Sequence, residues 1–380
     1  MRSSIIGLVV GAVLGVVLGA TVIAPRLQRA TPHIAATERA PAPTATEIAK
    51  QLPRALVPKP AVSWRMASSF PLDTSIAGTL AKRIDSRIWE VSHGQIEIRP
   101  HGPGAAISPA TDLSEAVGSG AIDAALTAPG TGAVKVPALR IFSGVPFGPD
   151  ADEFLAGLEF GGGRELLDGI NHARDVHGIV CGFLPPPAFG WFRRELQAPQ
   201  DLKGLRMSIE GLGAKVLARL GVEVVDLSPG DLMLALEQGT IDAVSYASPV
   251  IDQRMEFGTW LKNYYPQGWQ SPTTLELIIN LQQWERLNGS QRAQVDTTCG
   301  DNVRYSLAAG DAGQFQALKD MVARGVSLQR LSPAMREALE RAWQQVVYQE
   351  NSNDPEFRRV WQSLTDFRND FAVWRELARP

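Results

Sequence analysis

The sequence predicts an α/β fold of two lobes, each built from alternating strands and helices. Between residues 201 and 249, three strand-like segments alternate with two helical ones, as in parallel βαβ units. An earlier segment, 112–124, matches 231–243 at seven of thirteen positions, and a Ser-Pro pair precedes each copy. Duplication of a helix–strand element explains this match better than chance. Two such lobes predict a ligand cleft at the carboxyl ends of the strands.

The elements within 201–249 follow from side-chain periodicity and from turn residues. Residues 205–210 alternate apolar and polar side chains, and 222–227 is rich in β-branched residues, so both are predicted to be strands. Ser228-Pro229 supplies an N-cap and a preset first-turn φ for a helix over 231–238. The third strand is predicted at 240–247.

The rest of the folded part begins near Val62 and follows the same alternation. From residue 281 to Pro380 the pattern is almost wholly helical, and its last aromatic residues, including Trp361 and Trp374, are expected to pack on a lobe. The other predicted strands are 62–70, 95–102, 177–184 and 273–280, and the other predicted helices include 75–92, 150–160 and 164–176.

The N-terminal segment 1–25 contains an uncharged apolar run over residues 5–24, which is long enough to span a bilayer. Pro25 follows the best candidate cleavage position, so we prefer an uncleaved transmembrane anchor to a cleaved signal peptide. A glycine at every fourth position of the run suits close helix–helix contact and also ordinary membrane-helix composition. Residues 26–61 are rich in Ala, Pro and Thr and predict an extended spacer.

The predicted division of the folded part into lobes follows the order of these elements. Lobe I is expected over 62–185, completed by about 273–316. Lobe II is expected over 186–272, completed by about 317–375.

Composition and motifs exclude several classes of function. The 37 basic and 40 acidic residues nearly balance, so nothing points to nucleic acid. The five histidines have no metal-ligand spacing, and no catalytic or phosphate-binding motif occurs, so we predict no cofactor, no metal and no enzyme. Cys181 and Cys299 are interpreted as two unpaired buried thiols, and a single bridge in an oxidising compartment stays open.

A set of motifs, kept in order and spacing from about Trp64 to Trp374, resembles the solute-binding proteins of TRAP transporters, most of all the branch that binds 2-oxo acids and dicarboxylates. The motifs are SGVPFG (143–148), the glycines 161–163, GWFRREL (190–196), DLKGLRM (201–207), GLGAKVLARLGVEVV (211–225), LALEQGTIDA (234–243), YYPQGW (264–269) and TLELIIN (274–280). The resemblance implies a two-lobed periplasmic-binding-protein (Venus flytrap) fold with a hinge.

The same resemblance implies partners and a location. Such a protein captures a small organic solute and delivers it to the membrane subunits of a sodium-coupled TRAP permease. With the predicted anchor, it would lie in the bacterial periplasm, attached to the inner membrane, and a homodimer is compatible with it. The alternative function is an anchored sensor or interaction protein that kept the scaffold and lost transport.

The predicted pocket departs from the family pattern. The family's carboxylate-binding Arg falls at Ser208, a Gln falls near Pro187, and a Glu-Trp pair becomes Ser245-Tyr246. Aromatic residues expected after the first repeat copy are missing from 127–134.

Two interpretations of this divergent pocket follow. Arg206 is two residues before Ser208 on the same strand, so both side chains face the same side of the sheet and Arg206 could reach a carboxylate from there. A simpler explanation is that Arg206 is a solvent-exposed charge at the edge of the strand. The interpretation we prefer is a changed, uncharged or polyhydroxylic ligand, because Glu210 would repel a carboxylate and hydroxyl groups can replace the Arg. The predicted substrate-binding residues are Ser69, Pro187, Trp191, Arg206, Ser208, Glu210, Ser245, Tyr246, Trp269 and Glu276.

Overall fold

The computed structural model describes residues 59–107, 112–130 and 136–378. Residues 56–380 form one compact unit, separate from residues 1–55, and the description below concerns that unit. The predicted anchor and all but the last three residues of the predicted spacer lie outside the described residues. Within the described residues, no helix is both long enough and apolar enough to cross a membrane.

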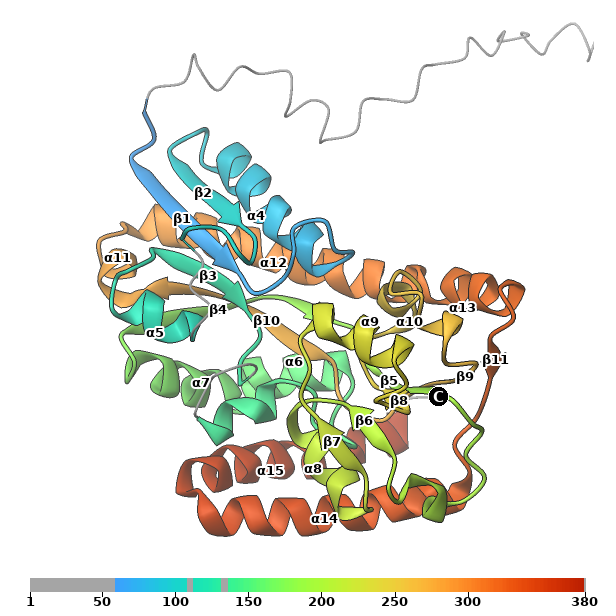
Figure 1. The fold of residues 1–380 in the computed structure, drawn as a ribbon. Helices are drawn as coiled ribbons and strands as arrows, with labels where there is room; N and C mark the ends of the chain where they lie inside the picture. The colour runs from blue at the N-terminus through green and yellow to red at the C-terminus, as the bar shows by residue number, and fades with distance from the viewer. Residues whose placement is uncertain (1–58, 108–111, 131–135, 379–380) are drawn as a thin grey trace, which may run out of the picture. The chain divides into compact units, whose positions relative to one another are not determined.

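The first sheet has five strands in the order β2-β1-β3-β10-β4 (Figure 1). β1 pairs in parallel with β2 and β3, whereas β10 runs antiparallel to β3 and β4. Helices α4 and α12 cover one face, and α5 and α7 pack against the other. The bounds are β1 Val62–Ser68, β2 Ile96–His101, β3 Ala124–Thr127, β4 Val176–Leu184, β10 Thr273–Asn280, α4 Ala77–Val91, α5 Leu113–Gly118, η3 Pro137–Phe142, α6 Ala151–Phe160, α7 Gly163–His172, α11 Leu281–Glu285 and α12 Gly289–Ala312.

The second sheet has six strands in the order β11-β9-β5-β8-β6-β7. β6 pairs in parallel with β7 and β8, and β5 runs antiparallel to β8 and β9. The bounds are β5 Ala188–Phe192, β6 Arg206–Ser208, β7 Glu223–Val225, β8 Ala243–Val244, β9 Asn263–Gly268, β11 Ser327–Leu328, η4 Pro199–Leu202, α8 Gly211–Arg219, α9 Pro229–Glu237, α10 Pro249–Asp252, η5 Phe257–Thr259, α13 Gln314–Ala323, α14 Pro333–Asn353 and α15 Pro355–Ala378. Strands β5, β9 and β11 were not predicted from the sequence.

The two copies of the sequence repeat occupy equivalent places in the two sheets. In the first sheet α5 leads into β3, which pairs with β1 so that Met66 faces Ala124. In the second sheet α9 leads into β8, which pairs with β6 so that Met207 faces Ala243. The equivalent registers are what duplication of a helix–strand element predicts. The Ser-Pro pair of the first copy lies outside the described residues.

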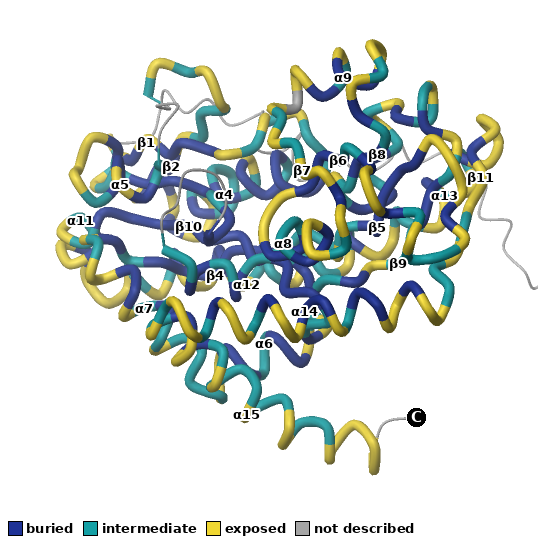
Figure 2. Tube along the Cα trace, turned by 60° about the horizontal axis from the view of Figure 1, so that its bottom comes forward, coloured by how far each residue is buried: buried dark blue, intermediate teal, exposed yellow. Residues whose placement is uncertain are grey.

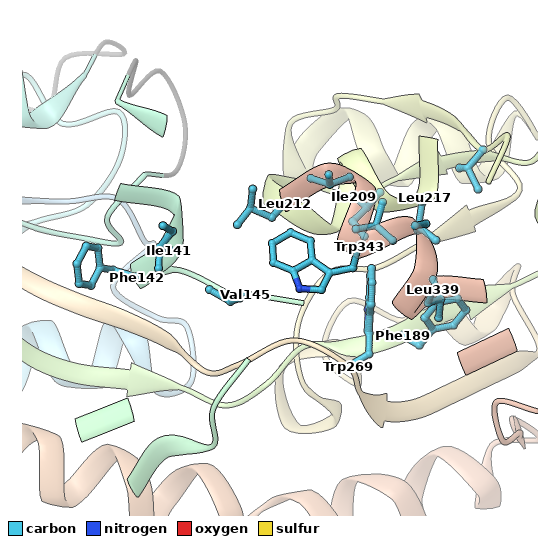
Figure 3. Packing of buried hydrophobic residues seen from close by; sticks show 14 of the residues in the cluster. Ile141, Phe142, Val145, Phe189, Ile209, Leu212, Leu217, Trp269, Leu339 and Trp343 are labelled. Carbon is cyan, nitrogen blue, oxygen red and sulfur yellow. The ribbon is translucent and has the colours of Figure 1, made fainter. Parts of the chain in front are cut away.

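A continuous apolar core joins the two lobes beneath the segments that cross between them. It combines Val145 from the first lobe with Leu212 from the second, and Trp343 of α14 lies among them (Figure 3). α14 packs on α8, and α15 packs on η3, α6 and α7, so the C-terminal helices contact elements of both sheets. Figure 2 shows β4 and β10 as almost wholly buried, whereas the end of α15 is exposed.

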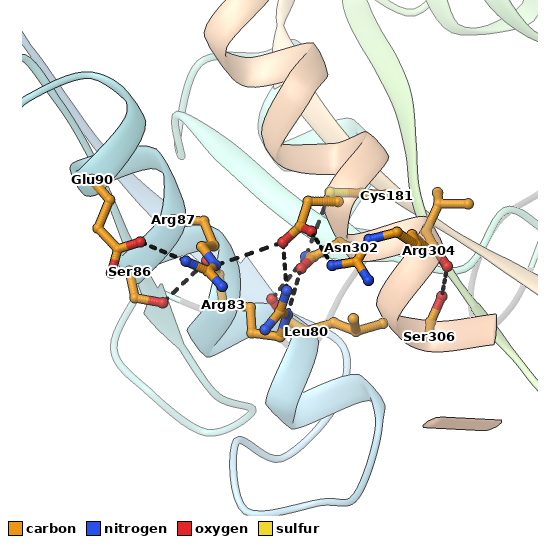
Figure 4. A network of polar contacts seen from close by, with 11 residues as sticks. Leu80, Arg83, Ser86, Arg87, Glu90, Cys181, Asn302, Arg304 and Ser306 are labelled. Atoms are coloured by element: carbon orange, nitrogen blue, oxygen red, sulfur yellow. Dashed lines mark hydrogen bonds and ion pairs between the residues drawn. The ribbon is translucent and has the colours of Figure 1, made fainter. Parts of the chain in front are cut away.

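The interpretation of Cys181 and Cys299 as unpaired thiols is wrong, because the two form a disulfide that joins β4 to α12. The sequence could not show this, since 118 residues separate the pair. Beside the bridge, Asn302 of α12 donates to the Leu80 carbonyl of α4 at 3.1 Å, and Arg83 Nε donates to Asn302 Oδ1 at 3.1 Å (Figure 4). A covalent link and a polar network therefore hold α12 on the first lobe.

Candidate functional site

The carboxyl ends of the parallel strands carry the polar residues on which the site is built. In the first sheet, Ser69 follows β1, and its hydroxyl donates to Thr127 Oγ1 at the end of β3, at 2.8 Å. In the second sheet, Ser208 ends β6, and Ser245 and Tyr246 follow β8. Ligands of open α/β sheets bind at this edge, and the crossing segments carry the chain from one edge to the other.

Backbone pairing fixes the polar wall of the second lobe. The Ser245 amide donates to the Ser208 carbonyl at 2.9 Å, which extends the β6–β8 ladder by one residue. The Ser245 hydroxyl donates to the Ala188 carbonyl at 3.0 Å, and the Ala188 amide donates to the Ala247 carbonyl at 2.8 Å. The end of β8 is therefore tied to the start of β5, directly after the crossing from the first lobe.

Tyr246 and Glu210 interact electrostatically on this wall. Burial raises the pKa of the Tyr246 phenol, and the negative charges of Asp252 and Glu210 raise it further. Burial also raises the pKa of the Glu210 carboxyl, with a smaller contribution from Asp226. Glu210 and Tyr246 (37 % exposed) both remain open to solvent. The wall therefore offers hydroxyl groups together with a carboxyl group that is held toward its neutral form.

A buried carboxyl group supports the wall from behind. Asp252 Oδ1 accepts from the Ala247 amide at 2.9 Å, and Oδ2 accepts from Trp191 Nε1 at 3.0 Å and from the Tyr264 hydroxyl at 3.2 Å. Burial raises the pKa of Asp252 to about 8, against the lowering effect of these three donors. Trp191, at 1 % exposure, is thus a core residue that holds Asp252 rather than a group that lines the cleft.

Arg206 is held by an acid of its own lobe. Its Nε donates to Asp242 Oδ2 at 3.0 Å and its Nη2 to Asp242 Oδ1 at 2.9 Å, with a further bond to the Gly239 carbonyl. In the first lobe, the Arg65 amide and Nε likewise bond to Asp123 Oδ2, at 2.9 and 3.4 Å. Both acids are the Asp of the repeated Gly-x-Ile-Asp-Ala sequence. Arg206 is therefore half of a repeated structural pair at the start of its strand, and a ligand would have to compete with Asp242 for it.

Two further predicted site residues are buried away from this wall. Glu276, in the middle of β10, accepts from Asn171 Nδ2 of α7 at 3.1 Å, and burial raises its pKa to about 7. Trp269 packs edge-on against Phe147 and Phe189 in the core beneath the crossing. Its indole Nε1 is buried and has no hydrogen-bond partner among the described residues.

The structure therefore brings Ser208, Glu210, Ser245 and Tyr246 together. Pro187 lies half-buried in the crossing that leads into β5, and Ser69 belongs to the edge of the other lobe.

Gln270 is a residue that the sequence reasoning missed. It lies where β9 crosses back to β10, and a Cβ atom added at Gly213 of α8 would be 2.9 Å from its Oε1. The same Oε1 would be 3.6 Å from a Cβ at Gly144 of the first lobe. The Gln270 amide thus lies between the lobes at the start of α8. Its position directly before the predicted strand 273–280, where the chain returns to the first lobe, could have indicated a residue between the lobes.

The titratable side chains of the described residues do not form a metal site. In the described part of the chain, no cluster of three or more His, Cys, Asp or Glu side chains could hold a metal ion.

Comparison with known proteins identifies the family. Residues 67–353 match the family model described as bacterial extracellular solute-binding protein, family 7, DctP. The chain belongs to this family. A monocarboxylate 2-oxoacid-binding periplasmic protein of Nostoc sp. strain PCC 7120 is 32 % identical over 321 residues, which cover 84 % of this chain and 87 % of that protein.

Solved DctP-family structures have the same fold. A TRAP transporter solute-binding protein from Bordetella bronchiseptica RB50, a dimer with calcium and picolinate bound, has a TM-score of 0.78 at 30 % identity, over 84 % of this chain and 95 % of that one. A TRAP periplasmic solute-binding protein from Colwellia psychrerythraea, with calcium and pyruvate bound, has a TM-score of 0.77 at 26 % identity, over 83 % and 97 %. The predicted family and the two-lobed α/β fold are thus confirmed, and this is a family of solute-binding proteins rather than of enzymes.

Proposed function

We propose that this DctP protein captures a small organic acid between its two lobes in the periplasm and delivers it to a TRAP permease. The observation that carries the proposal is the relative from Nostoc, which binds monocarboxylate 2-oxo acids and resembles this chain over most of both lengths. The hydroxyl groups of Ser208 and Tyr246, at the carboxyl ends of β6 and β8, would donate to the oxo group of such an acid. The Ser245 hydroxyl already donates to the Ala188 carbonyl, so it would accept from a solute hydroxyl. Nothing found supports the alternative of a sensor that has lost transport.

A second candidate ligand class is an uncharged, polyhydroxylic solute. It is favoured by the composition of the second lobe's wall, where Ser208 offers no charge, Arg206 is bound to Asp242, and Glu210 would repel an anion if ionised. Hydroxyl groups on the solute would pair with the hydroxyl and carboxyl groups of this wall.

A thermal-shift screen of the compact unit from Leu56 to Pro380 tests both candidates. Short monocarboxylates, 2-oxo acids, dicarboxylates and polyols are added singly. A ligand that binds only the folded state at 100 times its Kd stabilises it by about 2.7 kcal/mol. Stabilisation by acids alone supports the leading proposal, stabilisation by polyols alone supports the second candidate, and a panel without any response contradicts both.

We also propose that residues 5–24 remain as an anchor in the inner membrane, on the strength of the apolar run and Pro25. Mass spectrometry of protein extracted from membranes is expected to find the intact N-terminus, and a chain that begins after residue 20 would contradict an anchor.

A homodimer is proposed from the exposed apolar residues Trp374 and Leu377 of α15, and light scattering of the purified protein tests it.

A further inference from the structure

The wall of the second lobe lacks a free cation for an anionic solute. Ser208 stands where a guanidinium would be expected, and the guanidinium of Arg206 already has two carboxylate contacts and a carbonyl contact. Tight recognition of a carboxylate ordinarily uses a charged, often bidentate, donor. If the proposed acid is bound, a donor must come from another part of the cleft.

Arg140 of η3 is placed on the other lobe with its backbone fixed. The neighbouring residues Ala138, Leu139, Ile141 and Phe142 are all buried in the core beneath the crossing, where Figure 3 labels Ile141 and Phe142. Arg140 is half-buried and is absent from that core. The four buried apolar side chains fix the backbone of this short helix, and Arg140 is the one charged residue in it.

Two observations place the backbone of Arg140 near the cleft edge of the first lobe. Gly130 lies three residues beyond the end of β3, and a Cβ there would be 2.5 Å from the Arg140 amide nitrogen. Toward the C-terminus, Gly144 follows Arg140 by four residues and lies beside the Gln270 amide between the lobes. Arg140 thus lies between the carboxyl end of β3 and the inter-lobe position of Gln270.

The guanidinium of Arg140 has no partner within the described residues. Every other half-buried Lys or Arg in that part of the chain donates to a side chain or a carbonyl group, as Arg83 does to Asp301, Arg174 to Asp112 and Lys215 to Glu350. Partial burial of a charge without a partner is costly. A bound solute would supply the acceptor that the described residues do not.

We propose that Arg140 binds the carboxylate of the solute, supplying from the first lobe the guanidinium that Ser208 does not supply from the second. This inference rests on the proposed function and names its ligand class, a monocarboxylate with an adjacent oxo or hydroxyl group. The carboxylate contacts Arg140, and the adjacent oxo or hydroxyl oxygen faces the hydroxyl groups of Ser208 and Tyr246. A solute held from both lobes favours closure, because each lobe contributes one half of the contacts.

The test is calorimetry on the full chain with pyruvate and with its uncharged amide, pyruvamide. Arg140→Gln is expected to weaken pyruvate binding about 10- to 100-fold, as loss of a charged hydrogen bond does, and to leave pyruvamide binding within about twofold. Arg140→Lys keeps the charge without the planar fork and is expected to be intermediate. The matched control is Arg286→Gln, an exposed arginine of the same lobe that should leave both affinities unchanged.

Thermal unfolding separates recognition from damage to the fold. Arg140 loses no partner among the described residues, so Arg140→Gln is expected to unfold at the wild-type temperature or above it. Unchanged pyruvate affinity in Arg140→Gln overturns the inference and leaves the proposed function standing, and so does an equal loss of pyruvate and pyruvamide. If the wild-type chain binds neither pyruvate nor any other small acid of the panel, the proposed function fails, and the assignment of Arg140 fails with it.

Discussion

At the scale of single residues, Asp252 and Glu276 are the two carboxyl groups of the described residues whose pKa values burial raises most. Asp252 accepts three hydrogen bonds in the second lobe, whereas Glu276 accepts one from Asn171 in the first. In both, desolvation dominates and raises the pKa, to about 8 and about 7. Neither forms an ion pair in the described part of the chain, so each favours its neutral form at moderately acidic pH.

Glu276→Gln is expected to remove one source of pH-dependent stability. The folded-state pKa of about 7 lies above the ordinary value of 4.5, so the wild-type contribution is fully present below about pH 4.5 and is lost as pH rises through 7. Gln keeps the acceptor for Asn171 and cannot ionise. Relative to wild type, the variant should therefore gain on the order of 1–3 kcal/mol in free energy of unfolding between pH 5 and 8.

Urea denaturation at several pH values measures this difference. The comparison with wild type cancels the opposite trend from His177, whose pKa burial lowers to about 4. Glu285→Gln, at an exposed position on α11, is the control and should follow the wild-type curve. Parallel curves for wild type and Glu276→Gln would show that Glu276 does not titrate in this range.

A second residue-scale prediction concerns Ser208. Ser208→Arg in a Glu210→Ala background places a guanidinium at the end of β6 and removes the acid that would pair with it. We expect pyruvate affinity to rise roughly tenfold over the Glu210→Ala parent, because a charged hydrogen bond adds about 1.5–3 kcal/mol. Ser208→Gln in the same background supplies length without charge. Equal affinities of the Arg and Gln variants would mean that this position does not reach the solute's carboxylate.

At the scale of elements, the bridge between β4 and α12 holds a helix that continues into the other lobe. α12 packs on β4 and α4, and after Gly313 the chain continues as α13, which packs on α10. Gln314 connects these parts: its Oε1 accepts from the Val250 amide at 3.1 Å and its Nε2 donates to the Ser248 hydroxyl at 3.4 Å. The Cys181–Cys299 bridge thus fixes the end of this connection that belongs to the first lobe.

Replacing both bridged residues, as Cys181→Ala with Cys299→Ala, is expected to destabilise the first lobe. A bridge that closes a loop of this length restricts the unfolded chain, and loss of a native bridge typically costs about 2–5 kcal/mol. Chemical denaturation of the double variant against oxidised wild type measures the loss, and wild type under reducing conditions should unfold as easily as the variant. A double variant as stable as the oxidised wild type would show that the bridge adds no stability.

At the scale of the whole folded unit, four segments of the described residues cross between the lobes. They are 185–187 between β4 and β5, 269–272 between β9 and β10, Gly313 between α12 and α13, and Asp354 between α14 and α15. A Cβ at Gly268 would be 2.8 Å from Pro186, so two of the crossings are in close contact. We expect the backbone changes of a lobe closure to concentrate at these crossings, with the packing of α14 and α15 adjusting to them.

Closure of the lobes over a solute should be visible in solution scattering. The radius of gyration is expected to fall when a solute from the thermal-shift screen is added, because the lobes approach each other. Compounds from the panel that gave no thermal shift serve as controls. A solute that binds with micromolar affinity and leaves the scattering profile unchanged would exclude a closing mechanism for this protein.

The sequence alone determined the alternation of elements, the repeat and the family, because these properties are written in local periodicity, turn residues and motif order. The pairing of residues far apart was decided only by the tertiary structure. Strand parity placed Arg206 on the same face as Ser208, but it could not show that Asp242, 36 residues later, would already occupy the guanidinium. The same limit applies to the Cys181–Cys299 bridge and to the burial of Glu276. Arg140 shows the converse, since only the tertiary structure shows that no acceptor for its guanidinium lies among the described residues.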